Sequence, residues 1–295
     1  MEVSIIQAIQ SIHAEGFWGD LVDSLMLGIT FFGESFFLLL ALFVIYWCID
    51  KKTGDYLVFS VYLSAGLNFT LKDIFHRARP CFSDACKDGT IRHVKVNNFF
   101  VDTDFKPTSY SFPSGHAAIG SALYFGVAKC VKKRWVTILS IVLTVLIAIS
   151  RVYLGVHYPS DVLVGLICGA LCSVLLGSLY VKLYKYKYYF YLGISLVFFV
   201  FGIVTSSSTG FLLSGLGLGY VVGNIIEERW IRFESNSAWW KRIIRFFVGL
   251  VATAAVFVPL YLLVGTKGAW GMLTLFFTIV SATSLVPLLF KTLKL

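Results

Sequence analysis

The chain has 295 residues, of which 58% are hydrophobic and only 14% are charged, against about 25% charged in an ordinary soluble domain. Long apolar runs and a mean hydropathy of +0.81 predict a polytopic helical membrane protein, because each bilayer crossing needs about 20 apolar residues. The net charge of +9 does not indicate nucleic acid, since the basic residues fall between apolar runs, where they set membrane topology.

The apolar runs predict an all-α transmembrane bundle. Residues 1–20 read as a short interfacial segment, and Glu2 stands where a secretory signal would be basic, so we expect no cleavable signal peptide. Residues 21–180 contain every polar cluster that suggests chemistry, and residues 181–295 form a transmembrane extension. Nine spans are predicted: 21–48, 56–75, 114–130, 135–150, 161–180, 188–204, 211–226, 243–264 and 270–290.

Lysine and arginine predict the orientation of the bundle. Most of the 25 basic residues fall in loops on one side, and most of the others lie in or beside the long loop at 77–112. The positive-inside rule makes the first side cytoplasmic, with the N-terminus outside and the C-terminus inside. We expect a multi-pass protein of the plasma membrane with an extracytoplasmic site, or a lumenal site in the endoplasmic reticulum if the organism is eukaryotic.

One segment between the fourth and fifth spans combines a cation, an imidazole and a carboxylate. It reads S-R-V-Y-L-G-V-H-Y-P-S-D at 150–161. Ionisable groups at the membrane border are costly, so they predict function. Arg151 can hold an oxyanion with its forked donors. His157 can act as nucleophile or base, and Asp161, four residues later, can accept the imidazole N–H and fix its tautomer.

A second segment, K-D-I-F-H-R-A-R-P at 72–80, adds two cations at the outer end of the second span. Lys72 and Arg79 are about two helical turns apart, so both can project to one side. Together with Arg151 they predict a phosphate site, because phosphoryl transfer depends mainly on positioning and on stabilising the charge of the equatorial oxygens.

A third segment, Y-S-F-P-S-G-H at 110–116, leads into the third span. Pro113 suits the start of a helix. Ser114, Gly115 and His116 would then present backbone N–H groups at the positive end of the helix dipole, which favours an anion. His116 also supplies a second imidazole that can protonate a leaving oxygen and then activate water.

The patterns K-x6-R-P, P-S-G-H and S-R-x5-H-x3-D, present in this order over residues 56–180, resemble the signature of the type-2 phosphatidic acid phosphatase superfamily. The resemblance implies that His157 attacks phosphorus, that Asp161 orients it, and that His116 is the general acid and base. It also implies a reaction without metal or other cofactor. The phosphate-binding residues implied are Lys72, Arg79, Ser114, Gly115 and Arg151.

The expected function is hydrolysis, through a phosphohistidine intermediate, of a lipid phosphate or prenyl pyrophosphate such as phosphatidic acid or undecaprenyl pyrophosphate. The alternative is a soluble sugar phosphate, because nine spans are similar to the glucose-6-phosphatase branch. A non-hydrolytic phospholipid transporter or scramblase would need polar groups along a path through the membrane, and the later spans offer almost none. Transfer to an acceptor other than water stays open. Membrane lipids are the expected partners, and the sequence leaves the oligomeric state open.

A few residues outside the signature carry weaker expectations. Cys81 and Cys86 in the outer loop could form a small disulfide in an oxidising compartment. Glu34, inside the first span, could face the site or satisfy an internal hydrogen bond. Asn68 could position Lys72 or hold a neighbouring helix. Glycines every four residues in the seventh span predict close internal helix packing. They are Gly215, Gly219 and Gly223.

Overall fold

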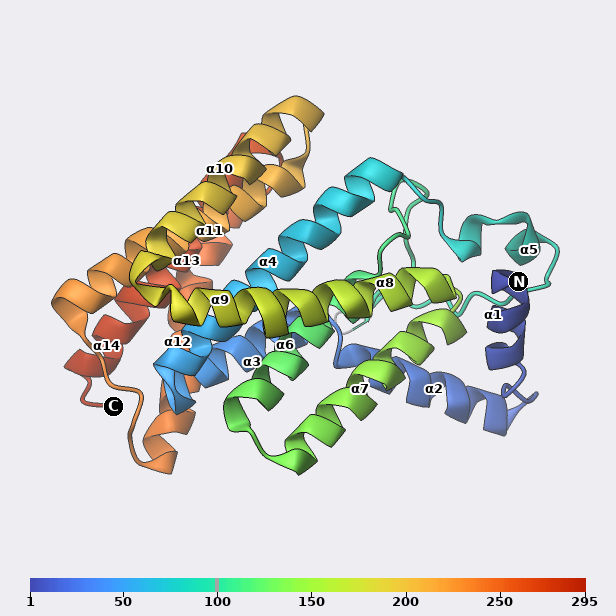
Figure 1. Cartoon of the computed structure of the whole chain (residues 1–295), viewed down its shortest axis with the longest axis horizontal. Helices are drawn as coiled ribbons and strands as arrows, with labels where there is room; N and C mark the ends of the chain where they lie inside the picture. Colours follow the sequence, from blue (N-terminus) through green and yellow to red (C-terminus); the bar gives the residue numbers. More distant parts are fainter. Residues whose placement is uncertain (99–100) are drawn as a thin grey trace. The chain divides into compact units, whose positions relative to one another are not determined.

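The structure, a computed structural model, describes residues 1–98 and 101–295, so residues 99 and 100 of the predicted outer loop lie outside the described part. The backbone forms two compact units, residues 1–41 with 56–179 and residues 42–55 with 180–295. Helices wholly in the first unit are α1 (Glu2–Gln10), α2 (Phe17–Phe31), α5 (Asp84–Lys87), α6 (Gly115–Val131), α7 (Arg134–Tyr153) and α8 (Pro159–Ala170), which continues into a π-helical turn at Leu171–Leu176 (Figure 1).

The second unit contains the predicted extension. Its helices are α10 (Lys187–Thr205), α11 (Ser208–Ile226), α12 (Trp239–Leu263), α13 (Gly268–Val280) and α14 (Val286–Thr292). Helices α3 (Ser35–Val44), α4 (Lys51–Phe75) and α9 (Gly177–Lys182) run from one unit into the other. The part of the chain that the structure describes contains no strand beyond an isolated bridge between Asn97 and Asp102, so the all-α expectation is confirmed.

The membrane character is confirmed, but the number of spans is not. Six helical segments are long and apolar enough to cross a bilayer, and the pair α2 and α3 would add a seventh. Helices α4 and α6, which correspond to the predicted second and third spans, are not among these segments, and α6 has only 17 residues. Nine spans and the sidedness of the termini therefore stay predictions. The six segments, found among residues 1–98 and 101–295, are 134–153, 159–182, 184–205, 208–231, 239–263 and 268–292.

The first predicted span, 21–48, corresponds to two helices and not to one straight helix. Helices α2 and α3 are bent by 46° at a break that contains Gly33. A Cβ at Gly33 would lie 2.9 Å from a methyl group of Ile147 and 3.2 Å from Cβ of His116, so only glycine fits at this contact. The break brings Glu34, a carboxylate inside an apolar run, to a partner, which lipid would not supply.

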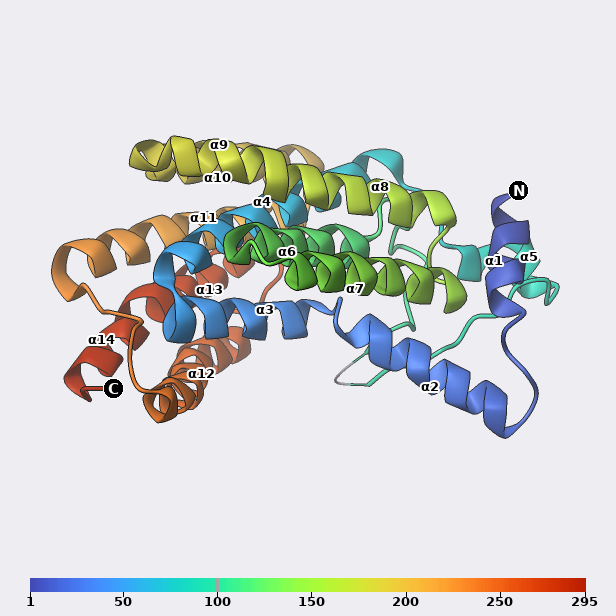
Figure 2. The same ribbon diagram turned by 60° about the horizontal axis from the view of Figure 1, so that its bottom comes forward.

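The N-terminal ends of α6 and α8 meet because small residues let the two backbones approach. A Cβ at Gly165 on α8 would lie 2.7 Å from the carbonyl oxygen of Ser114, and Gly169 lies equally close to α6 one turn later. Helix α6 runs alongside both α7 and α8 in two views (Figures 1 and 2). The amide of Ser114 donates to the carbonyl of Asp161 at 2.9 Å, which joins two of the predicted motifs.

The glycine stripe of the second unit packs internally, as predicted. A Cβ at Gly219 on α11 would lie 2.6 Å from the carbonyl oxygen of Phe276 on α13, and Gly215 is as close to Met272. Helices α11 and α13 therefore touch backbone to backbone. A Cβ at Gly193 on α10 would have no described atom within 4 Å, so this glycine belongs to no such contact.

These two glycines give a matched stability test. Gly219→Ala forces α11 away from α13, and overpacking of this kind costs about 1–3 kcal/mol. Gly193→Ala meets open space, so it gains helix propensity worth about 0.5–1 kcal/mol. In detergent we expect the melting temperature to fall for the first variant and to hold or rise for the second. Equal changes in both would contradict the packing of α11 on α13.

Candidate active site

His157 lies between α7 and α8 and is 2% exposed. Its Nδ1 is 3.5 Å from Oδ2 of Asp161, in the first turn of α8, and its Nε2 is 3.1 Å from Nη1 of Arg79. The carboxylate therefore faces one ring nitrogen while the other faces a cation. This is the arrangement that a nucleophilic imidazole needs when Nδ1 carries the proton and Nε2 keeps its lone pair.

Two residues that the sequence did not point to support Asp161. Ser111 Oγ donates a short hydrogen bond to Asp161 and lies 3.3 Å from Nδ1 of His157, so it bridges the pair. Arg77 Nη1 donates to Asp161 at 2.8 Å, and its other terminal nitrogen pairs with Glu2 of α1. Arg77 lies two residues before the signature arginine, with no motif to mark it. The carboxylate is thus held by a hydroxyl, a guanidinium and the amide of Tyr158.

The three predicted cations do converge. Arg79 is anchored by the backbone carbonyls of Ser109 and Val156, at 2.9 and 3.0 Å, and Lys72 by the carbonyl of Tyr110 at 2.7 Å. The ring of Phe105 lies under the Arg79 guanidinium at 3.6 Å and within 5.8 Å of that of Arg151. Carbonyls and one aromatic face hold these groups, so their charge is not neutralised.

Arg151, in the last turn of α7, is fully buried. Its Nη1 donates to Thr30 Oγ1 of α2 at 3.0 Å, whereas Nε and Nη2 have no hydrogen-bond partner among the described residues. A buried guanidinium with two unused donors is costly unless an anion arrives to accept from them. Arg151 is therefore the clearest mark of a phosphate site. The sequence placed it beyond the end of the fourth span, but α7 continues to Tyr153 and includes it.

The predicted anion cradle at the start of α6 is smaller than expected. Ser114 is the N-cap, and its own amide is occupied by the carbonyl of Asp161, which leaves the amides of Gly115 and His116 in the first turn. The buried Oγ of Ser114 has no partner in the described part of the chain and is available to a ligand. Asn68 donates to the carbonyl of Pro113 at 3.1 Å, so it holds this turn.

His116 has a carboxylate beside it. Its Nε2 lies 2.9 Å from Oε1 of Glu34, an ion-pair distance at which neither atom has an aligned hydrogen bond within residues 1–98 and 101–295. Of the two interpretations of Glu34, the structure favours the one in which it faces the site. The sequence feature that pointed to Glu34 was a carboxylate next to a glycine within an apolar run. Cys81 and Cys86, considered for a disulfide, are both free in this structure.

The electrostatics suit a neutral nucleophile. Burial, together with the nearby charges of Arg79 and Lys72, lowers the pKa of His157 well below its ordinary value. Burial and the charge of Arg151 also lower the pKa of Arg79, to about 9, so Arg79 still carries its proton at neutral pH. At pH 7 the imidazole is therefore unprotonated and faces positive charge, as attack on a bound phosphate requires.

Arg151→Met tests the buried cation without relying on turnover. Removing an unpaired buried charge while keeping the volume is neutral or stabilising, by about 1 kcal/mol or more. We expect the variant to melt in detergent at or above the melting temperature of the unaltered protein. Inorganic phosphate should raise the melting temperature of the unaltered protein by mass action, but not that of the variant. A variant that melts lower and still responds to phosphate would contradict the assignment.

Arg77→Gln tests whether the residue acts through Asp161. Because Arg77 touches the carboxylate and not the phosphate pocket, we expect kcat for phosphate release to fall about tenfold with KM within about twofold, equivalent to about 1.4 kcal/mol. Arg77→Lys should restore part of the rate. The control is Lys95→Gln, which breaks an outer-loop ion pair with Asp104 and should leave kcat unchanged. A change in KM alone would instead place Arg77 on the substrate.

Comparison with known proteins matches two parts of the chain. Residues 55–187 match the model of the PAP2 superfamily, and residues 211–295 match that of the PAP2 superfamily phosphatase transmembrane extension. The chain is 30% identical over 179 residues to phosphatidylglycerophosphatase B of Bacillus subtilis, covering 56% of this chain and 79% of that one. It is 46% identical over 72 residues to undecaprenyl-diphosphatase of Sulfolobus acidocaldarius, covering 24% of this chain and only 34% of that one.

A crystal structure of a transmembrane PAP2-type phosphatidylglycerolphosphate phosphatase from Bacillus subtilis aligns with 61% of this chain and 85% of its own, at 27% identity and a TM-score of 0.47. The family models cover both the site and the extension, and the Bacillus relative is matched over most of its length. The chain therefore belongs to the PAP2 superfamily of membrane phosphatases.

Proposed function

We propose that this protein hydrolyses a phosphate monoester or pyrophosphate carried by a membrane lipid, at the extracytoplasmic face and through a phosphohistidine at His157. The observation that carries the proposal is the arrangement of His157, backed by Asp161 and facing Arg79, beside the unused donors of the buried Arg151. Such a site gains most from a ligand with a phosphate group, because each free donor then finds an acceptor.

The reaction would run in two balanced steps. In the first, Nε2 of His157 attacks phosphorus, the bond to the leaving oxygen breaks, and His116 gives that oxygen a proton. In the second, His116 takes a proton from water as the water attacks phosphorus and the bond to Nε2 breaks, which releases inorganic phosphate. Glu34 would hold His116 in place through both steps. Arg79, Lys72 and Arg151 would stabilise the equatorial oxygens throughout.

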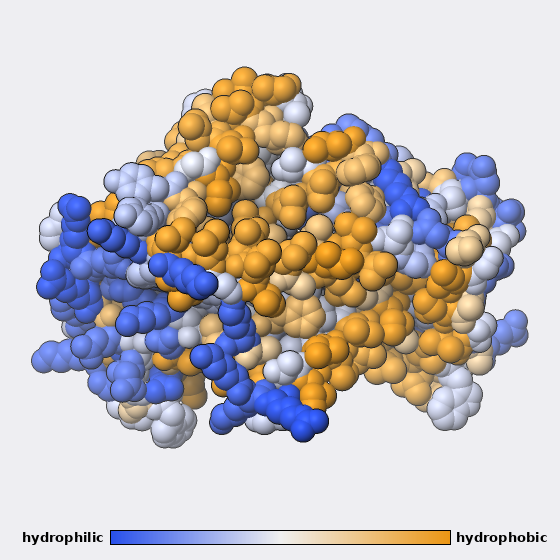
Figure 3. Space-filling view, viewed as in Figure 1, coloured by the Kyte–Doolittle hydropathy of each residue, from blue (hydrophilic) through white to orange (hydrophobic). Residues whose placement is uncertain are grey.

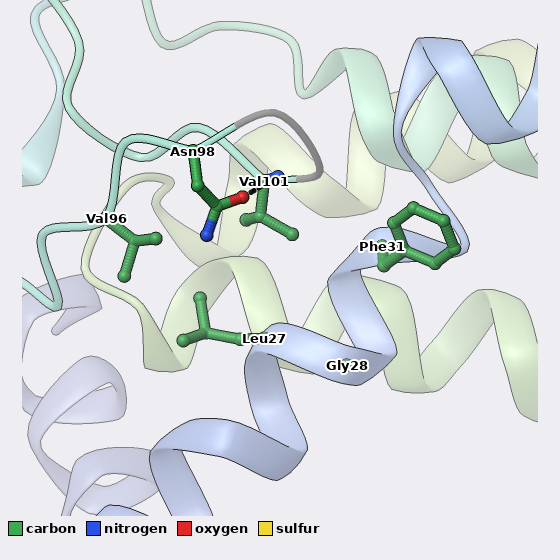
Figure 4. Close-up of a pocket in the computed structure, with 6 residues that line it drawn as sticks. All are labelled: Leu27, Gly28, Phe31, Val96, Asn98 and Val101. Atoms are coloured by element: carbon green, nitrogen blue, oxygen red, sulfur yellow. Dashed lines mark hydrogen bonds between the residues drawn. The ribbon is translucent and has the colours of Figure 1, made fainter.

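An apolar pocket favours a lipid over a sugar phosphate. It has a volume of about 410 Å³ and is formed by α2 and the outer loop (Figure 4). Leu27 in its wall also packs against the cluster of Tyr153, Leu154 and Val156, which ends directly before His157. A pocket with almost entirely apolar walls next to a phosphate site suits an acyl or prenyl chain. Its lining residues are Leu27, Gly28, Phe31, Val96, Asn98 and Val101.

The extracytoplasmic assignment rests on the distribution of charge. Most lysines and arginines outside the site occur in loops at the opposite ends of the predicted spans. The named relatives act on undecaprenyl diphosphate and on phosphatidylglycerophosphate, to judge by their names, which supports a lipid substrate of this class.

A phosphate-release panel on purified protein with chelator present tests the substrate. It should contain undecaprenyl pyrophosphate, phosphatidic acid, phosphatidylglycerophosphate and glucose 6-phosphate, with His157→Asn as the blank. We expect turnover of at least one lipid at a rate more than about a thousandfold above the blank, since the variant loses its nucleophile. Preference for glucose 6-phosphate would overturn the lipid assignment, and full activity in His157→Asn would overturn the mechanism. Loss of activity to chelator would indicate a metal route.

The intermediate can be trapped directly with p-nitrophenyl phosphate, whose leaving group needs no general acid. His116→Asn should still form the phosphoenzyme and then fail to hydrolyse it, because no base activates water. We expect an acid-labile phosphate on the peptide containing His157, seen by mass spectrometry after an alkaline quench, in His116→Asn and not in His157→Asn. Label on another residue would contradict the proposal.

A further inference from the structure

Another pocket, with both polar and apolar residues in its walls, lies in the second unit around the start of α12 and the end of α14. It is open, with a volume of about 600 Å³. Among the side chains that line it, five are basic and one is acidic. Figure 3 shows hydrophilic residues gathered over this end of the second unit. The charged lining residues are Arg232, Glu234, Lys241, Arg245, Lys291 and Lys294.

Arg245 is the central group of this basic pocket, the name we use for it below. It is 4% exposed, although it lies on a pocket wall. Its Nη2 donates to the main-chain oxygen of Leu295, the last residue of the sequence, at 2.7 Å and its Nη1 donates to the carbonyl of Ser235 at 2.9 Å, so the guanidinium is fixed in place. Its Nε has no hydrogen-bond partner in the part of the chain that the structure describes. A buried cationic donor without an acceptor is costly, as at Arg151, and indicates a missing anion.

Other donors converge on the same place. The buried Oγ of Ser237 has no partner among the residues described, and Ser237 directly precedes the N-cap of α12, a helix of 25 residues. Lys241 donates to the carbonyl of Lys294, and Lys291 to that of Ile231 at 2.6 Å, which leaves each ammonium with further hydrogens to donate. A helix N-terminus with a free hydroxyl and several cations around it is suited to phosphate oxygens.

The wall beneath these groups is apolar. The rings of Phe233 and Phe290 lie 6.0 and 5.8 Å from the Arg245 guanidinium, and both line the pocket. Membrane topology alone explains why basic residues occur in these loops. It does not explain why one of them is buried with an unused donor, or why an unbonded hydroxyl lies beside it.

We propose that the basic pocket binds a phosphate-bearing anion, separately from the catalytic site of the first unit. No histidine is among its described lining residues, so the ligand would be held and not hydrolysed. The shared chemistry is a phosphate group that accepts from Arg245, Ser237 and the lysines. An anionic lipid headgroup and a free diphosphate both carry this chemistry, and the apolar wall would admit the first chain carbons of a lipid.

The test compares two double variants of the full chain, each losing two positive charges. Lys241→Gln with Lys294→Gln alters the pocket, whereas Lys132→Gln with Lys133→Gln alters an exposed turn between α6 and α7. Native mass spectrometry measures phosphatidylglycerol retained in micelles, with phosphatidylcholine as the neutral reference. Melting shifts measure binding of inorganic pyrophosphate. Because both variants keep the same active site, only a difference between them reports on the pocket.

We expect binding to weaken about thirtyfold in the pocket variant, at roughly 1 kcal/mol for each of its two lysines, and to change little in the other. Ser237→Ala, which removes an unbonded hydroxyl and should not disturb folding, should weaken binding severalfold. Loss of phosphatidylglycerol alone would identify a headgroup site, and loss of pyrophosphate alone a site for a free anion. Equal binding by both double variants, or no effect of Ser237→Ala, would overturn the proposal. Hydrolysis of p-nitrophenyl phosphate, measured in parallel, should be unchanged in all three, so a failed pocket and a failed phosphatase give separate results.

Discussion

The candidate site depends on positive charge that is held out of water and whose hydrogen bonds within the described residues go to neutral groups. Arg151 is fully buried with two donors unused by the described residues, and Arg79 and Lys72 lie nearby on carbonyls that fix their position but do not neutralise them. The empty site therefore has a high free energy, which an arriving phosphate lowers. In the proposed reaction, the binding energy of the phosphate would hold phosphorus in front of His157.

The signature residues could be predicted from the sequence because each motif lies within a short segment of consecutive residues. His157 and Asp161 are four residues apart on the lead into a helix, and that spacing alone predicts their contact. The bounds of most helices followed from apolar runs, to within a few residues. The third span was expected to begin at Ser114, which proves to be the N-cap of α6.

The supporting residues could not be predicted, because their contacts join distant parts of the chain. Ser111 and Thr30 are ordinary hydroxyl residues until the fold places them against Asp161 and Arg151. Helix periodicity also cannot show a break such as the one at Gly33, where a tertiary contact outweighs helix propensity. Lys187, which lies between two predicted spans, is buried and donates to Asn224 and Glu228 within the second unit. The sequence shows that a lysine is present at this position, but it does not show which distant residues the lysine contacts.

The link from Arg77 to Glu2 gives the N-terminal helix a role that its position would not suggest. Glu2 accepts from both Arg77 and Ser160, so α1 is linked through Arg77 to Asp161, the carboxylate beside His157. An affinity tag fused directly ahead of this helix would bring its own charges next to that tie. Kinetic constants measured on amino-terminal fusions of this protein therefore need comparison with a sample from which the tag has been cleaved.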